Sequence, residues 1–304
     1  MKNTTTTLRN SLLALAAAAA CTGALAAGNA VLAISGQPET LDPYNTNTTL
    51  TTAVTKSFYE GLFEFDKDLK IKPVLAESFE ASKDGLVYTF KLRQGVKFHD
   101  GTPFTADDVL FTLGRIMADG SDMKSYGTDI KESRKIDSHT IEIETKAPQP
   151  ILPQILSQVY IMSQKWCEAN NAVKPVDRRK GVENVASFKT NGTGPFHVRE
   201  RQPGVKTVFV RNPRYWGKVE SNVQEVVFTP IANPATRVAA LLSGEIDVME
   251  PVPVQDIARV NSNPGTRVIA GPELRTIFLG MDQKRDELLF SNVKGKNPFK
   301  DKRV

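Results

Sequence analysis

The stretch between residues 223 and 248 constrains the fold most, because its pattern is that of a strand, a helix and a second strand in succession. The strands are expected at 223–230 and 246–248, and the helix at 234–242. Ser243, Gly244 and Glu245 follow the helix and form its C-terminal cap, for which glycine is typical. Such alternation of strands and helices is typical of α/β proteins in which some strands pair in parallel. The sequence therefore predicts an α/β fold.

Hydrophobic periodicity and turn residues predict the other elements of the chain. Residues 87–92 alternate apolar and polar side chains, which indicates a strand with one buried face. Residues 48–63 carry apolar side chains four positions apart, which indicates one face of a helix. We expect further elements as strands at 30–35, 136–145, 196–201, 206–211 and 275–281, and as a helix that begins at Thr105 and continues to Ile116.

The N-terminus has the pattern of an export signal. Lys2 and Arg9 supply positive charge, and residues 12–20 form an uninterrupted apolar segment that is too short to span a bilayer. Small residues around Ala26 give a cleavage site between Ala26 and Ala27. We therefore predict that residues 1–26 are a signal peptide and that the mature protein is periplasmic. The alternative is a lipoprotein anchored through Cys21.

Composition indicates a soluble globular protein of about two domains, with 304 residues, 40% hydrophobic residues and 24% charged residues. The net charge is +5, and two of these charges lie in the predicted signal, which leaves +3. No alternation of aromatic and basic residues accompanies this charge, so we expect no nucleic-acid partner. Removal of the signal leaves Cys167 as the single cysteine, expected as a small buried side chain.

Four sequence blocks in a fixed order carry a resemblance to a known family. The second block joins residues 192–196 to residues 211–216, the third spans 237–248, and the fourth spans 297–304. The first block, between residues 76 and 109, contains the signature positions Tyr88, Phe90, Leu92, Arg93, Gly95, Val96, Phe98, Asp100, Gly101, Asp107, Asp108 and Val109. On these blocks the chain resembles the bacterial extracellular solute-binding proteins of family 5, the dipeptide, oligopeptide and nickel binders.

The resemblance implies a Venus-flytrap periplasmic binding protein, type II-like and of cluster C, whose ligand is enclosed between two lobes. The first lobe is then discontinuous, formed by residues 27–50 and 190–272, and residues 51–189 form a small extra domain. The second lobe begins at about residue 273 and is truncated, so we interpret the chain as an N-terminal fragment. We expect such a fragment to bind its ligand weakly or not at all.

The same resemblance places a hinge or crossover segment at Asn191, Gly192, Thr193, Gly194 and Pro195. Glycines permit the backbone rotations that closure requires, and Pro195 fixes the start of the next strand. An ordinary glycine turn is the alternative for this segment.

Ligand contacts are expected where the first strand ends, because open α/β sheets bind ligands beyond the carboxyl ends of their strands. Backbone groups exposed there can pair with an extended peptide without reading its side chains. The candidate ligand-binding residues are Ser35, Gly36, Gln37, Tyr126 and Arg275. Trp216 is expected to pack inside the protein.

We therefore expect a monomeric, exported binding protein that captures short peptides and delivers them to the membrane permease of an ABC transporter. A nickel complex, haem or an oligosaccharide is the alternative ligand on the same fold, and a secreted hydrolase or a protein scaffold is the alternative outside the family.

An enzyme is not expected, because adjacent helical residues such as Asp107 and Asp108 point about 100° apart and cannot face one substrate together. The sequence contains no catalytic or metal-ligand motif of known spacing, so we expect no cofactor and no metal site.

Overall fold

The computed structural model describes residues 28–271 and 276–303. The chain forms two compact units, one that ends at Thr266 and a second that begins at Arg267. The predictions for the signal peptide, for Cys21 and for Arg275 concern residues outside the described ranges.

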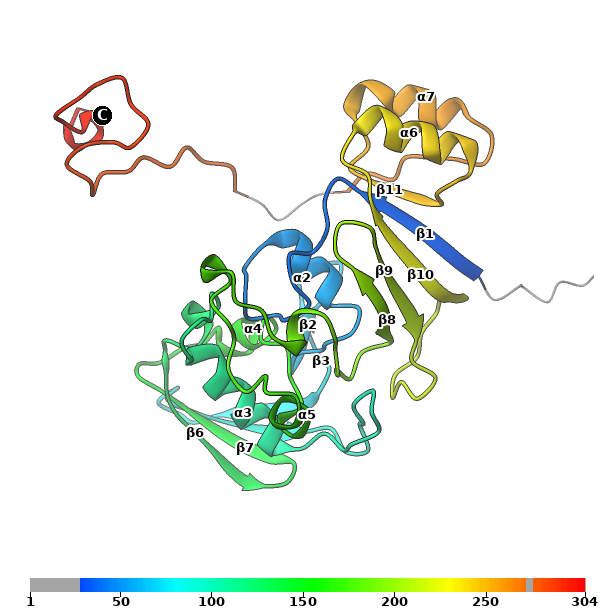
Figure 1. Ribbon diagram of the computed structural model, residues 1–304. Helices are drawn as coiled ribbons and strands as arrows, with labels where there is room; N and C mark the ends of the chain where they lie inside the picture. Colours follow the sequence, from blue (N-terminus) through cyan, green and yellow to red (C-terminus); the bar gives the residue numbers. More distant parts are fainter. Residues whose placement is uncertain (1–27, 272–275, 304) are drawn as a thin grey trace, which may run out of the picture. The chain divides into compact units, whose positions relative to one another are not determined.

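A five-stranded sheet forms one part of the first unit (Figure 1). Its strand order is β11-β1-β10-β9-β8, and β1 pairs in parallel with both β10 and β11, whereas β9 is antiparallel to β10 and to β8. The strands are β1 (Gly28–Ile34), β8 (Phe196–Gln202), β9 (Lys206–Arg211), β10 (Val223–Pro230) and β11 (Val248–Glu250). The predicted α/β fold is confirmed, and this sheet is built from two segments far apart in the sequence.

Helix α6 (Pro234–Ser243) connects β10 to β11, as the strand–helix–strand pattern predicts. Gly244 follows it with a φ of 78°, in the left-handed region that ends many helices. Inside the helix, the buried Arg237 donates hydrogen bonds to the backbone oxygens of Ile231 and Pro251, which follow β10 and β11. Arg237 thereby fixes the carboxyl ends of these two strands relative to each other.

A second, antiparallel sheet has the strand order β4-β5-β7-β6, and the hairpin β2-β3 precedes it in the sequence. The side chains of Tyr88, Phe90 and Leu92 on β5 are buried, as the alternation predicts. These elements are β2 (Phe63–Phe65), β3 (Ile71–Pro73), β4 (Ala76–Ala81), β5 (Val87–Leu92), β6 (Ile130–Asp137) and β7 (Thr140–Thr145).

Helix α3 (Ala106–Met117) packs against this sheet through Val109, Leu113 and Ile116, all of which are buried. Thr105 precedes it, and Asp108 accepts a hydrogen bond from the Thr105 backbone N–H at 2.9 Å, as in a capping box. The shorter helices are α2 (Thr49–Thr55), α4 (Leu152–Leu156), α5 (Gln164–Ala169) and α7 (Ile257–Ser262), with 3-10 turns at Lys124–Tyr126, Arg178–Lys180, Val185–Ser187, Val254–Asp256 and Pro298–Lys300.

Several predicted elements are wrong in extent or in type. The single strand expected at 136–145 is instead the end of β6 and the whole of β7, which pair antiparallel with a turn between Asp137 and Thr140. The helix expected at 48–63 is limited to α2, because the carbonyl oxygens of Ser57 and Phe58 accept hydrogen bonds from residues 196 and 194 instead of from a continuing helix. The strand expected at 275–281 is absent over its described residues 276–281, which form no regular secondary structure and are exposed. A strand requires a partner for its backbone groups, and the described residues provide none there.

No helix in residues 28–271 or 276–303 combines the length and the apolar character that crossing a lipid bilayer requires. Cys167 lies in α5 and is fully buried, as expected, and burial raises its thiol pKa to about 12. The thiol is therefore protonated and inert at neutral pH.

A buried ion pair links the segment after β1 to helix α3. The Arg115 guanidinium donates to both carboxylate oxygens of Asp42, with 2.8 Å between Nη1 and Oδ1, and neither side chain is exposed. Arg115 Nε donates to the backbone oxygen of Ala172, and the Tyr44 backbone N–H donates to Asp42. The pair therefore joins three segments that are distant in the sequence.

Replacement of Arg115 by methionine is expected to lower the free energy of unfolding by about 3–5 kcal/mol, because it leaves the Asp42 carboxylate buried without a counter-charge. The double variant Asp42→Leu with Arg115→Met removes both charges and should lose less. Urea denaturation of both variants measures the difference. Arg134→Met, which breaks an exposed pair with Glu142, is the control and should lose less than about 1 kcal/mol. Equal losses in the single and double variants would contradict this account.

Candidate ligand-binding site

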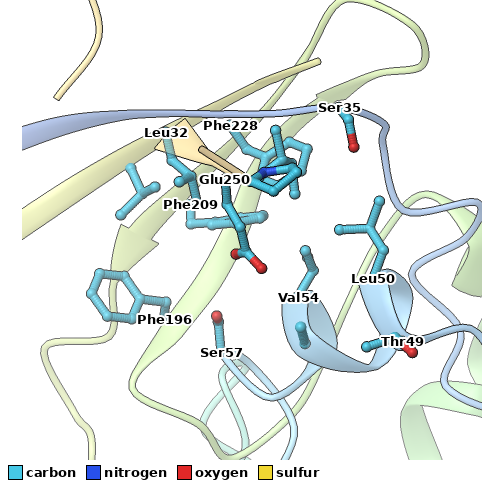
Figure 2. A pocket seen from close by; sticks show the side chains of 14 residues that line it. Leu32, Ser35, Thr49, Leu50, Val54, Ser57, Phe196, Phe209, Phe228 and Glu250 are labelled. Carbon is cyan, nitrogen blue, oxygen red and sulfur yellow. The ribbon is translucent and has the colours of Figure 1, made fainter. Parts of the chain in front are cut away.

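A pocket of about 400 Å³ opens between α2 and one face of the five-stranded sheet (Figure 2). Its walls come from β1, β8, β9, β10, β11 and α2, so residues from both ends of the first unit's sequence meet there. The lining residues are Leu32, Ile34, Ser35, Thr49, Leu50, Ala53, Val54, Ser57, Phe196, Phe209, Val226, Phe228, Glu250 and Pro251.

The pocket lies at the carboxyl ends of the parallel strands, the edge at which open α/β sheets bind ligands. Ser35 directly follows β1, and Glu250 ends β11. Because β1 and β11 are parallel neighbours, with Ile34 opposite Glu250, these two lining residues come together at one edge. An apolar pocket with a few polar groups at such an edge is the usual form of a small-molecule site.

Of the predicted ligand-binding residues, the structure places Ser35 in the lining of this pocket. Gly36 and Gln37 follow it along the chain, and their backbone groups form no hydrogen bond within the described residues. Gln37 is held by its side chain, whose oxygen accepts the backbone N–H of Gly204. Tyr126 is partly buried against the core of the unit and does not line the pocket. The ligand contacts of these residues stay a prediction.

Sequence reasoning missed most of the wall. Phe196, Phe209 and Phe228 come from three neighbouring strands, so only the strand pairing shows that their rings share one space. Alternation within each strand could have shown which face of the sheet each ring lies on, since alternate residues of a strand share a face. Glu250 was missed because β11 was expected two residues earlier, at 246–248.

The segment Asn191–Pro195 lies against the backbone that follows α2, and this close contact explains its glycines. A Cβ atom on Gly192 would lie 1.8 Å from the carbonyl oxygen of Phe58, and one on Gly194 would lie 2.8 Å from the Phe58 carbonyl carbon. The Gly194 N–H donates to that same oxygen at 3.1 Å. Absence of side chains, rather than rotational freedom, is what these two positions require.

His99 and Asp100, which belong to the first sequence block, also form hydrogen bonds to residues 191–194. The His99 backbone N–H donates to Gly192 O, the Gly192 N–H donates to His99 Nδ1 at 3.1 Å, and His99 Nε2 lies 3.1 Å from Gly194 O. These contacts fit a neutral imidazole that carries its proton on Nε2. Asn191 and Asp100 add two more hydrogen bonds, at 3.0 and 2.9 Å.

Glu60 completes the set of contacts. Its carboxylate accepts hydrogen bonds from Thr193 Oγ1 at 2.7 Å, from the Tyr215 hydroxyl at 2.8 Å and from Trp216 Nε1 at 2.8 Å. Burial raises the pKa of Glu60, and these three donors oppose the rise. Trp216 is therefore a packing residue, as expected, and the Arg93 guanidinium lies over its ring at 4.6 Å. These contacts fix residues 191–195 in one conformation. A hinge would require a second conformation, so the hinge role stays a prediction.

Gly192→Ala is expected to lower the free energy of unfolding by more than about 3 kcal/mol, since the new Cβ overlaps the Phe58 carbonyl and one backbone must move. Gly114→Ala is the matched control. Gly114 lies inside α3, where a new Cβ would meet no atom within 4 Å, so alanine there should stabilise the protein by about 0.5–1 kcal/mol. Denaturation midpoints of both variants test the contrast, and a tolerated Gly192→Ala would refute the close-contact explanation.

The environment of His99 predicts a pH dependence of stability. Burial, aided by the neighbouring His197, lowers the pKa of His99 from 6.5 to about 4. The unfolded chain therefore binds more protons than the folded one between these values. This contribution to stability is present above pH 6.5 and is lost as the pH falls to 4, by up to about 3 kcal/mol.

Unfolding free energies between pH 7 and pH 4.5 measure this effect in the wild type and in His99→Gln. We expect a shallower slope in His99→Gln and an unchanged slope in the control His139→Gln, whose Nδ1 lies in an exposed contact with the Ser138 hydroxyl. Equal slopes in all three proteins would contradict the prediction.

Among residues 28–271 and 276–303, no three side chains of His, Cys, Asp or Glu gather in a group that could hold a metal ion. The polar side-chain atoms that line the pocket are hydroxyls and one carboxylate. Such a set suits the binding of an organic solute better than the direct ligation of a transition metal.

Comparison with curated proteins finds relatives over most of the chain. Glutathione-binding protein GsiB of Escherichia coli O6:K15:H31 (strain 536 / UPEC) is 35% identical over 281 residues, which cover 90% of this chain and 52% of GsiB. GsiB of Salmonella typhi is 34% identical over 275 residues, which cover 89% of this chain and 51% of the relative. The chain thus spans about half the length of the curated relatives it matches.

Solved structures share the fold. The periplasmic binding protein DppA of Helicobacter pylori, in complex with the peptide STSA, is 29% identical with a TM-score of 0.69, and the match covers 78% of this chain and 49% of DppA. AgaA of A. tumefaciens R10, in complex with agropinic acid, is also 29% identical with a TM-score of 0.69, over 78% of this chain and 46% of AgaA. The α/β fold of periplasmic binding proteins is therefore confirmed.

The family comparison agrees with the resemblance carried by the four sequence blocks. The model of bacterial extracellular solute-binding proteins, family 5 Middle, matches residues 70–304, which is more than half of the chain. This chain belongs to the bacterial extracellular solute-binding proteins of family 5.

Proposed function

We propose that this protein captures short peptides outside the cytoplasm and delivers them to the membrane permease of an ABC importer. The observation that carries the proposal is the pocket at the carboxyl ends of β1 and β11, next to the backbone of Gly36 and Gln37, which has no hydrogen-bond partner within residues 28–271 and 276–303. An extended peptide can add its backbone to such groups, while the apolar wall accepts side chains of different shapes. Glutathione, named for GsiB, and the STSA peptide bound to DppA are both short peptides, which supports this choice of ligand.

A binding role, rather than catalysis, is supported by the way the acidic and imidazole groups are used. Asp107 forms an ion pair with Lys135 at 2.8 Å. Asp108 accepts hydrogen bonds from the backbone N–H groups of Thr105 and Gln164. Both ring nitrogens of His99 contact the backbone of residues 192 and 194. None of these groups lines the pocket.

The domain organisation is part of the proposal. We assign residues 27–50 and 190–272 to the first lobe, residues 51–189 to a small extra domain, and residues 273–304 to the start of the second lobe. The five-stranded sheet draws its strands from 28–34 and 196–250, which supports a discontinuous first lobe. The boundary after Leu50 falls inside α2, whose residues on both sides of that point line the pocket with the sheet.

The site of action follows from the family and from the N-terminal pattern. Members are described as bacterial extracellular solute-binding proteins. We propose export by cleavage of a signal peptide near Ala26 and a periplasmic mature protein, with an anchor at Cys21 as the alternative.

Mass spectrometry under native conditions tests the ligand. We expect the protein, purified from its producing cells without refolding, to carry a ladder of adducts that fragment as short peptides. A single adduct with the mass of a metal chelate, haem or a sugar would overturn the peptide assignment.

A matched pair of variants links the adducts to this pocket. Ala53 and Thr52 are neighbours on α2, but only Ala53 lines the pocket. Ala53→Trp fills the space and should remove the peptide adducts, whereas Thr52→Trp should retain them. Adducts that survive in Ala53→Trp would place the ligand elsewhere.

A further inference from the structure

Glu250 is the only charged residue among the fourteen that line the pocket. Leu50, Val54 and the three phenylalanine rings surround the space, and the remaining polar lining consists of serine and threonine hydroxyls. Figure 2 shows the Glu250 carboxylate pointing into the space between Phe196, Ser57 and Val54. A single negative charge therefore faces an otherwise uncharged cavity.

The Glu250 side chain is exposed, and its carboxylate forms no hydrogen bond and no ion pair with any group in the described parts of the chain. Two other carboxylates of the first unit, Asp247 and Glu60, do have hydrogen-bond partners. Asp247, three residues earlier, accepts the backbone N–H of Val31 at 2.7 Å, and Glu60 accepts three hydrogen bonds. Folding thus accounts for Asp247 and Glu60 but provides no internal role for the charge of Glu250.

The chemistry of the pocket defines what can complete it. A carboxylate accepts hydrogen bonds only, so its partner must be a donor, and a cation is the strongest one. An ammonium group offers three donors, one for Glu250 and the others for hydroxyls of the lining such as that of Ser57, which Figure 2 shows on the same side of the pocket as the Glu250 carboxylate. Phenylalanine faces also attract cations. The apolar wall in turn favours a ligand whose cation is attached to a hydrocarbon chain.

We propose that this pocket is a subsite for a primary ammonium group attached to an apolar chain, and that Glu250 binds that ammonium directly. The inference rests on the proposed function and makes it specific, since it selects among short peptides. Two sources supply the chemistry, a lysine side chain and the amino terminus of a peptide whose first residue is apolar.

Four synthetic peptides separate the two sources in titration calorimetry. Ala-Lys-Ala carries both ammonium groups, Ala-norleucine-Ala keeps the hydrocarbon chain but lacks the side-chain charge, and the N-acetylated form of each lacks the terminal charge. A lysine subsite predicts that the norleucine peptide binds roughly three- to tenfold more weakly and that acetylation has little effect. A subsite for the amino terminus predicts instead that acetylation weakens binding roughly three- to tenfold and that norleucine has little effect.

The variant Glu250→Gln tests the residue itself. Its side chain keeps the size of glutamate, and Glu250 is exposed and has no partner among the described residues, so folding should be unaffected. We expect it to abolish whichever ammonium preference the wild type shows. Glu245→Gln is the matched control, because Glu245 is exposed, lies five residues away and does not line the pocket. Added salt should reduce the wild-type preference.

A charge reversal gives a readout that loss of folding cannot imitate. Glu250→Lys should weaken the peptides that carry the preferred ammonium and strengthen binding of Ala-Glu-Ala. If Glu250→Gln and the wild type bind all four peptides with equal affinities, the ammonium subsite is wrong while peptide capture stands. If none of the peptides binds to the wild type, both the subsite and the peptide assignment are overturned.

Discussion

The close contact between two backbone segments, residues 192–194 and Phe58, is the constraint on which the rest of the first unit depends. It places Gly194 N–H on the Phe58 carbonyl and brings the N–H of Phe196 to the carbonyl of Ser57. Phe196 begins β8, and Ser57 follows α2, so this contact fixes the sheet relative to the helix. Because the pocket lies between α2 and the sheet, its width is set by a contact that tolerates no side chain at two positions.

Buried polar groups fix the relative positions of these segments. Apolar packing alone would allow segments to slide, whereas the Asp42–Arg115 pair and the three donors to Glu60 can each be satisfied in one geometry only. Each of these groups joins segments that lie far apart in the sequence. The N-terminal segment, the four-stranded sheet with α3 and the five-stranded sheet therefore form a single compact unit, although β1 and β10 are separated by nearly 190 residues of chain.

The sequence was sufficient where local pattern decides structure and insufficient where distant segments decide it. The strands β5, β9 and β10 and the helices α3 and α6 follow from alternation, periodicity and caps. The rule that ligands bind at strand ends pointed to the position of Ser35, which lines the pocket, while its contact with a ligand stays a prediction. The early end of α2 could not be predicted, because a hydrogen bond from residue 194 causes it. The glycines at 192 and 194 were recognised as special, but their reason is steric contact with a segment more than 130 residues away. The three phenylalanine rings of the pocket became neighbours only once strand pairing was known.

The polar groups of the scaffold and those of the proposed binding surface differ in whether they have hydrogen-bond partners within the described chain. Buried polar groups that have partners within the chain, such as Asp42 and Glu60, already contribute their full interaction to the folded state and leave nothing for a ligand. The polar groups in and beside the pocket differ in kind: the Glu250 carboxylate in the lining, and the backbone of Gly36 and Gln37 that follows the lining residue Ser35, have no partners within the described residues. A ligand that supplies a backbone strand and an ammonium group would give these groups the partners that the described chain does not, and would exclude water from the apolar wall in the same step. Affinity and selectivity would then come from different atoms of one pocket, the first from apolar burial and backbone pairing, the second from a single charge.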